Sequence, residues 1–226
     1  MMRLLPTGID LRMQLIDYDL GLDRILSPSE CQEIVDFFLN KLDKGDIKQH
    51  LAKTRKETTT DSNYDKGHRA GYTASAYDFP YEQDIIDAVY AYAQQTKISL
   101  YQDRNPDKFR AMDWQFTMYK DNGDHFKEHQ DQSVSHKLNL YHNNMDSSDY
   151  IKYRYRKISC SIQLSDPEDY KDCSLQIRNS NESMMAPPNE QGSIVCFPSY
   201  AHHIVTPLTS GTRYAMVGWF FGPHWR

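Results

Sequence analysis

After Asp113 the hydrophobic pattern of the chain changes from a helical period to a period of two, and this change limits the folds open to it. In the segment DWQFTMYK large apolar residues occupy every second position, and RKISCSIQLSD repeats that alternation. Four further short segments follow, each bounded by Gly, Pro, Asn or Ser: SLQIR, GSIVCF, HIVTPL and TRYAMVGWFF. Short, turn-bounded segments of this kind predict β-strands packed as a sandwich or jelly roll.

Two segments in the first hundred residues show a helical period instead. Ser27 and Glu30 can form a capping box around the first-turn Pro28, and apolar residues then recur at helical spacing until Gly45. A second helix is predicted over residues 81–97, where apolar residues recur along one face.

Two polar stretches have the composition of loops. Residues 52–78 are rich in Thr, Asp and Gly, and residues 134–152 interrupt the β-pattern. We expect both to be loops, with a mobile loop and a lid as the two alternatives for residues 52–78. The whole pattern predicts a mainly β protein with helical support (α+β). Residues 1–110 form the helical and loop region, packed on a β-core of residues 111–226 in one structural unit.

Composition narrows the function classes. The net charge is -5, and no basic stripe is interleaved with aromatic residues, so a nucleic-acid partner is not expected. No stretch approaches eighteen apolar residues, and the N-terminus has no apolar signal region, so we expect a soluble cytoplasmic protein without a membrane partner. The cysteines are scattered without a CxxC pair, which predicts reduced thiols and no zinc site: Cys31, Cys160, Cys173 and Cys196.

The segment FKEHQDQS places His129 and Asp131 two positions apart, after a turn that contains glycine. On an extended strand both side chains point to the same side, so they can reach one metal ion together. Such a triplet also arises by chance, and it is then only the polar end of a strand. The segment AHHIV offers a third ligand, either His202 or His203. Two histidines and one carboxylate form the facial triad of non-haem Fe(II) oxygenases.

These motifs resemble those of the 2-oxoglutarate- and Fe(II)-dependent dioxygenases, in the prolyl 4-hydroxylase-like branch, over residues 111–222. The matching motifs are His129-Gln-Asp131, then His203-Ile-Val205-Thr-Pro207, then Gly211-Thr-Arg213. The resemblance implies a double-stranded β-helix, which is a jelly roll. It also implies an iron site of His129, Asp131 and His203.

Further roles follow from the same resemblance. It implies that Arg213 pairs with the far carboxylate of 2-oxoglutarate and that Tyr119 and Gln163 contact this cosubstrate. Trp219 would line the substrate pocket. A guanidinium suits a buried dicarboxylate because it binds a carboxylate through two parallel hydrogen bonds. The alternatives are a structural salt bridge for Arg213, an internal hydrogen bond for Tyr119 and a place in the core for Trp219.

The implied activity is hydroxylation of a C–H bond, with succinate and CO₂ as coproducts. The implied cofactors are Fe(II), 2-oxoglutarate and O₂, with ascorbate in a supporting role, and no further catalytic side chain is required. Resemblance favours a prolyl residue of a peptide or protein as substrate, before a free amino acid or another small molecule. The competing class is a jelly-roll module that binds a metal or ligand without turnover. One turn departs from the family, since Asp172 and Cys173 stand where many relatives have two glycines.

Overall fold

Two antiparallel sheets packed face to face form the body of the protein. The computed structural model describes residues 14–16, 20–48, 50–51, 69–101, 112–132, 155–179 and 181–223. The larger sheet has eight strands in the order β1-β2-β12-β8-β15-β6-β5-β3. Its strands are β1 (Gln14–Ile16), β2 (Leu20–Arg24), β12 (Ser193–Pro198), β8 (Tyr155–Gln163), β15 (Arg213–Gly222), β6 (Met112–Tyr119), β5 (Tyr72–Ala76) and β3 (His50–Leu51).

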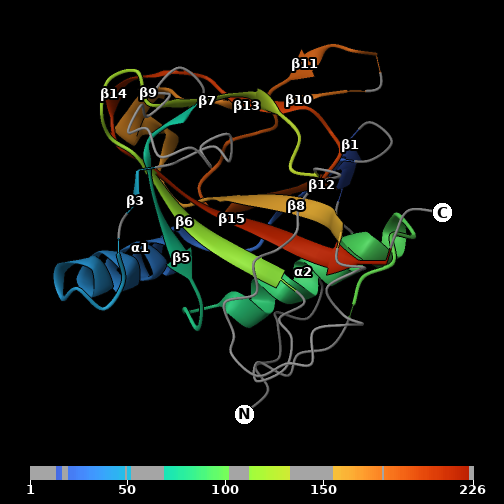
Figure 1. The fold of residues 1–226 in the computed structure, drawn as a ribbon, viewed down its shortest axis with the longest axis horizontal. Coiled ribbons are helices and arrows are strands. Elements are labelled where there is room, and N and C mark those ends of the chain that lie inside the picture. Colours follow the sequence, from blue (N-terminus) through green and yellow to red (C-terminus); the bar gives the residue numbers. More distant parts are fainter. Residues whose placement is uncertain are drawn as a thin grey trace, which may run out of the picture.

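The smaller sheet has five strands in the order β11-β10-β13-β7-β4 and lies over one face of the larger sheet (Figure 1). Its strands are β11 (Met184–Met185), β10 (Leu175–Arg178), β13 (His203–Val205), β7 (His125–His129) and β4 (Arg69–Ala70). A separate two-stranded sheet consists of β9 (Tyr170–Asp172) and β14 (Leu208–Gly211), and a short 3₁₀ helix, Pro167–Asp169, precedes β9. The expected mainly β, double-stranded β-helix fold is confirmed.

The two predicted helices are present and cover the other face of the larger sheet (Figure 1). Helix α1 (Pro28–Asp43) starts at the predicted capping box, in which Ser27 Oγ accepts from the Glu30 backbone N–H. Helix α2 (Glu82–Gln95) starts without a side-chain cap, since its N-cap Tyr81 has a left-handed backbone. Neither has the length and apolar character needed to cross a bilayer.

Alternation along β8 sorts its side chains between two environments. Ile158, Cys160 and Ile162 are fully buried in the core beneath the helices. Ser159 and Gln163 have the opposite parity, so they point between the sheets. A single strand therefore supplies apolar residues to the core and polar residues to the space where a site can form.

Strand boundaries differ from the sequence prediction in two places. The segment HIVTPL, expected as one strand, is divided into β13 and β14, because Pro207 has no N–H to continue a ladder. Residues 69–78, expected as part of a loop, contain β4 and β5, which pair with β7 and β6. The prediction was wrong there because the Ala residues of β5 do not favour a strand, and pairing with the neighbouring strand overrides that weak local preference. The remainder of 52–78 and the whole of 134–152 lie outside the described residues.

Lys157 of β8 is a buried cation, only 3% exposed, and burial lowers its pKa to about 8 from 10.5. Between these two values the unfolded chain binds more protons than the folded one, so stability rises with pH through that window. We expect Lys157→Met to be more stable than the wild type at neutral pH by about 1–2 kcal/mol. That gap should shrink near pH 10 in urea denaturation, and a gap independent of pH would contradict the prediction.

Candidate metal centre

Three side chains that could bind a metal ion, His129, Asp131 and His203, meet at the end of β7, facing β13. In the antiparallel pairing of these strands His203 stands directly opposite His129, and Asp131 follows two residues later. The Nε2 atom of His129 lies 3.7 Å from Asp131 Oδ1, and that of His203 lies 3.5 Å from Oδ2. One ligand atom from each residue falls within 4.8 Å of the others. This donor set of two imidazoles and one carboxylate fits Fe(II).

Backbone carbonyls set the tautomer of both imidazoles. Nδ1 of His129 lies 2.7 Å from the Lys127 carbonyl oxygen, and Nδ1 of His203 lies 3.0 Å from that of Ala201. A carbonyl oxygen only accepts, so each Nδ1 carries the proton and each Nε2 keeps its lone pair for a metal. Burial also lowers the pKa of His203, which favours the neutral imidazole.

Asp131 is held by a chain of hydroxyl groups from the larger sheet. Ser159 Oγ donates to Asp131 Oδ2 at 2.7 Å and lies 2.9 Å from Ser199 Oγ. Burial acts to raise the pKa of Asp131, but neighbouring groups, His203 first among them, hold that pKa well below its ordinary value. The carboxylate is therefore ionised and aimed at the two imidazoles.

Removing the Ser159 hydroxyl should loosen this arrangement. We expect Ser159→Ala to weaken Fe(II) binding by about 10-fold, because hydrogen bonds behind a ligand orient it toward the metal. Anaerobic calorimetry with Fe(II) measures the effect. Ser75→Ala, an exposed serine on β5, is the matched control and should bind as the wild type does. Equal affinity of all three proteins would exclude this role of Ser159.

His202, the alternative third ligand, points away from the centre. Its side chain is 47% exposed, and its Nδ1 lies 3.4 Å from Glu128 Oε1. Successive residues of an extended segment face opposite sides, so only one of the two adjacent histidines can turn inward. His203 is the inward one, at 6% exposure.

Arg213 is a buried cation at the start of β15, 4% exposed and opposite Tyr119 in the strand register. Its Nε donates to Gln163 Oε1 at 3.0 Å, and its guanidinium lies 5.6 Å from the Tyr119 ring centroid. Among the described residues it forms no ion pair with a carboxylate. A buried guanidinium without a protein carboxylate suits an anionic ligand.

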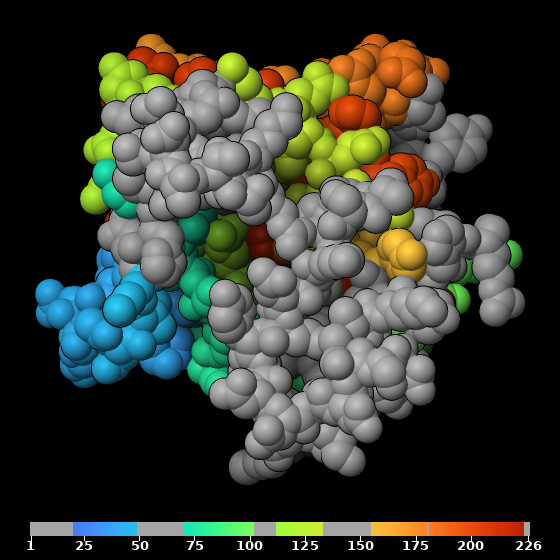
Figure 2. All heavy atoms as spheres, viewed as in Figure 1, coloured from blue at the N-terminus to red at the C-terminus, as the bar shows by residue number. Residues whose placement is uncertain are grey.

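One pocket between the sheets brings most of the predicted residues together. Its lining includes His129, Asp131, His203, Arg213, Tyr119 and Trp219, together with apolar residues such as Phe126, Leu175, Phe197 and Val217. In Figure 2, red atoms of β15 lie at the bottom of a hollow beside the green β6. Gln163 is the one predicted cosubstrate contact that does not line this pocket. It lines a neighbouring pocket, which also includes Arg213.

Trp219 lines this pocket and carries a buried polar atom. Its indole Nε1 is buried and has no hydrogen-bond partner within the described part of the chain. The Arg156 guanidinium lies 4.1 Å from the centroid of its ring. Sequence reasoning missed Arg156 and Ser159. The inward parity of Ser159 on β8 was the available signal.

The turn that departs from the family pattern has an unusual backbone. Asp172 and Cys173 have φ values of 65° and 53°, in the left-handed region that favours glycine. We expect Asp172→Gly to be more stable than Asp172→Ala by about 1 kcal/mol, although glycine is the weaker choice at ordinary strand positions. Both variants lose the hydrogen bond from Thr209, so urea denaturation of the pair isolates the backbone effect. A more stable alanine variant would show that the turn relaxes.

Comparisons with known proteins agree with this geometry. Residues 114–221 match the family model of the 2OG-Fe(II) oxygenase superfamily. A PKHD-type hydroxylase of Prochlorococcus marinus is 36% identical over 87 residues, which are 38% of this chain and 38% of the relative. The chain matches well under half the length of the curated relatives.

Among solved structures, a prolyl-4-hydroxylase of Pseudomonas putida has a TM-score of 0.63 at 14% identity, covering 89% of this chain and 92% of that one. A prolyl hydroxylase of Trichoplax adhaerens, solved with a peptide fragment of hypoxia inducible factor, has a TM-score of 0.59 at 13% identity. That match covers 91% of this chain and 84% of the other. At these identities the likeness establishes the fold.

Proposed function

We propose that the protein hydroxylates a C–H bond of a prolyl residue in a peptide or protein, because residues 114–221 match the family model of the 2OG-Fe(II) oxygenase superfamily. The observation that carries this proposal is the shared pocket, in which three metal ligands and a buried arginine face one space. A module that only binds a metal does not need a buried guanidinium in the same pocket as the metal-binding residues, so the pocket favours an enzyme.

The family uses Fe(II), 2-oxoglutarate and O₂, and the pocket contains residues suited to the metal and to 2-oxoglutarate. His129, Asp131 and His203 would hold the metal, and Arg213 and Tyr119 would hold the cosubstrate. When bound, these groups supply the oxidation of the C–H bond, with succinate and CO₂ as coproducts. The chain's own task is to orient the cosubstrate through Arg213 and to exclude water with the apolar lining.

Two groups support a peptide substrate carrying polar or acidic groups. The buried indole N–H of Trp219 can donate to a peptide carbonyl, and Arg156 beside it can attract an anionic group. The peptide bound to the Trichoplax adhaerens enzyme supports the same class. The Arg156 charge also suits the carboxylate of a free amino acid, which is the second candidate substrate.

Two finer expectations belong with this proposal. We propose a cytoplasmic location, because all four cysteines are buried as free thiols. We also propose that ascorbate supports turnover by keeping the metal reduced.

Succinate formation tests the proposal. Protein loaded with Fe(II) is mixed with 2-oxoglutarate and O₂, with a proline-containing peptide, free proline, or neither, and succinate and hydroxylated product are followed by NMR. Product from the peptide is the expected result, whereas product from free proline alone would favour the small-molecule alternative. Metal binding without any 2-oxoglutarate consumption would contradict the enzyme reading and leave a binding module.

A further inference from the structure

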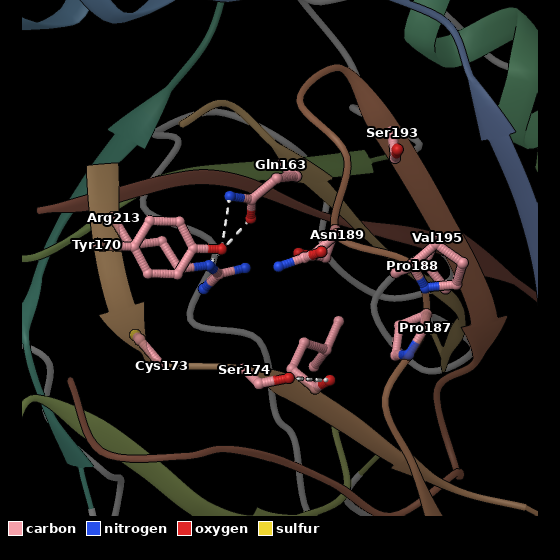
Figure 3. Close-up of a pocket in the computed structure, with 12 residues that line it drawn as sticks. Gln163, Tyr170, Cys173, Ser174, Pro187, Pro188, Asn189, Ser193, Val195 and Arg213 are labelled. Carbon is pink, nitrogen blue, oxygen red and sulfur yellow. Dashed lines mark hydrogen bonds between the residues drawn. The ribbon is translucent and has the colours of Figure 1, made fainter. Parts of the chain in front are cut away.

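A second pocket, drawn in Figure 3, adjoins the metal pocket and shares Arg213 with it. Polar side chains dominate its inner end, where Gln163 of β8, Tyr170 of β9 and Arg213 of β15 converge. Asn189 points toward them from the opposite side. Gln163 and Tyr170 are seven residues apart, whereas Asn189 and Arg213 come from later parts of the chain, and together they form a polar cluster around a buried cation.

Gln163 is the centre of this cluster, and its amide is already used by the protein. Its Nε2 donates to the Ser165 carbonyl at 3.0 Å and to the Tyr170 hydroxyl at 2.9 Å. Its Oε1 accepts from Arg213 Nε at 3.0 Å. An amide nitrogen has two hydrogens, so both donors of Gln163 are occupied. Gln163 is therefore suited to positioning its two neighbours rather than to binding a ligand itself.

Tyr170 is left with one donor to offer. Its hydroxyl oxygen accepts from Gln163, so its own hydrogen must point elsewhere, and no acceptor for it lies within the described part of the chain. Arg213 also keeps donors to offer: Nε is engaged by Gln163 and the guanidinium has a side-chain hydrogen bond with the Cys173 thiol, but its Nη groups have no oxygen acceptor among the described residues. Donors from both residues thus converge on one place, and a carboxylate is the group that accepts from several donors at once.

We propose that Tyr170, held in place by Gln163, donates a hydrogen bond to the far carboxylate of the 2-oxo acid beside Arg213. This inference rests on the proposed function and deepens it. The tyrosine completes an anchor that recognises a diacid, so it discriminates 2-oxoglutarate from 2-oxo acids that end in a methyl group. Gln163 is a positioning residue in this arrangement, in place of the direct contact expected from the sequence.

Binding of two 2-oxo acids to the Mn(II)-loaded protein tests the proposal without turnover. The second acid is 2-oxopentanoate, in which a methyl group replaces the far carboxylate. For Tyr170→Phe we expect the Kd of 2-oxoglutarate, measured by calorimetry, to rise about 10- to 100-fold, the range for one hydrogen bond to a charged group. The Kd of 2-oxopentanoate should change by less than about threefold, since that acid has no carboxylate for Tyr170 to reach.

Two further variants sharpen the reading. Tyr214→Phe removes the same hydroxyl from the residue next to Arg213, but Tyr214 stacks on Phe116 in the core, so both affinities should stay unchanged. Gln163→Leu should weaken 2-oxoglutarate binding as well. Adding Tyr170→Phe to this variant should raise the Kd of 2-oxoglutarate little further, because the effects of substitutions within one hydrogen-bond network are not additive.

The other outcomes overturn the proposal in distinguishable ways. An unchanged Kd for Tyr170→Phe would show that the hydroxyl does not reach the ligand. An equal loss of affinity for both acids would assign Tyr170 a structural role only. Failure of the metal-loaded wild type to bind 2-oxoglutarate would overturn the proposed function together with this inference.

Discussion

Replacing His203 by alanine is expected to abolish Fe(II)-dependent consumption of 2-oxoglutarate. The variant keeps His129 and Asp131, but two ligands hold a divalent ion far more weakly than three. Loss of a residue behind a ligand already costs 10- to 100-fold in affinity, so we expect the direct loss to exceed about 100-fold. Anaerobic Fe(II) titration and succinate formation give two independent measurements.

The adjacent histidine is the matched control. His202→Ala makes the same substitution one position earlier, on an exposed side chain that faces Glu128. It should bind Fe(II) within about threefold of the wild type, because it removes no ligand. Thermal melting of both variants checks that they fold. A normal His203→Ala with an impaired His202→Ala would reverse the assignment of the third ligand.

Replacing Arg213 by methionine is expected to remove 2-oxoglutarate binding while leaving metal binding intact. Two charge-assisted hydrogen bonds in a buried site contribute about 3 kcal/mol together, so the Kd should rise at least about 100-fold. Without cosubstrate, the variant should be at least as stable as the wild type. It replaces a buried cation, which has no carboxylate partner among the described residues, by an apolar side chain of similar length.

Arg213→Lys separates charge from shape. A lysine keeps the positive charge but cannot form the two parallel hydrogen bonds, so its Kd should fall between those of the wild type and Arg213→Met. Calorimetry with 2-oxoglutarate ranks the three proteins. A methionine variant that binds normally, or one that unfolds, would return Arg213 to the structural role considered from the sequence.

Local sequence patterns were enough to predict those features that lie within one strand or one turn. His129 and Asp131 share a strand side because side chains alternate with a period of two. Helix α1 begins at Ser27 as expected, since a capping box acts over only four residues. The unusual turn at Asp172 was also visible, and its left-handed backbone is of the kind that favours glycine.

Contacts between side chains of different strands could not be predicted from the sequence in the same way. The support of Asp131 by Ser159, and the link from Tyr170 through Gln163 to Arg213, depend on which strands are neighbours. The loop expected over residues 69–78 became two strands for the same reason, because pairing with β6 and β7 outweighs weak local preference.

The order of residues was enough to predict the alternation of the strands, the start of the first helix, and the residue types that can bind a metal and a dicarboxylate. Periodicity and capping act between residues close in the chain, so they can be read there. The folded structure was needed to show that His203 rather than His202 faces Asp131, and that Gln163 forms hydrogen bonds with both Tyr170 and Arg213. Those outcomes follow from strand pairing and register, which are set by packing across the whole sheet.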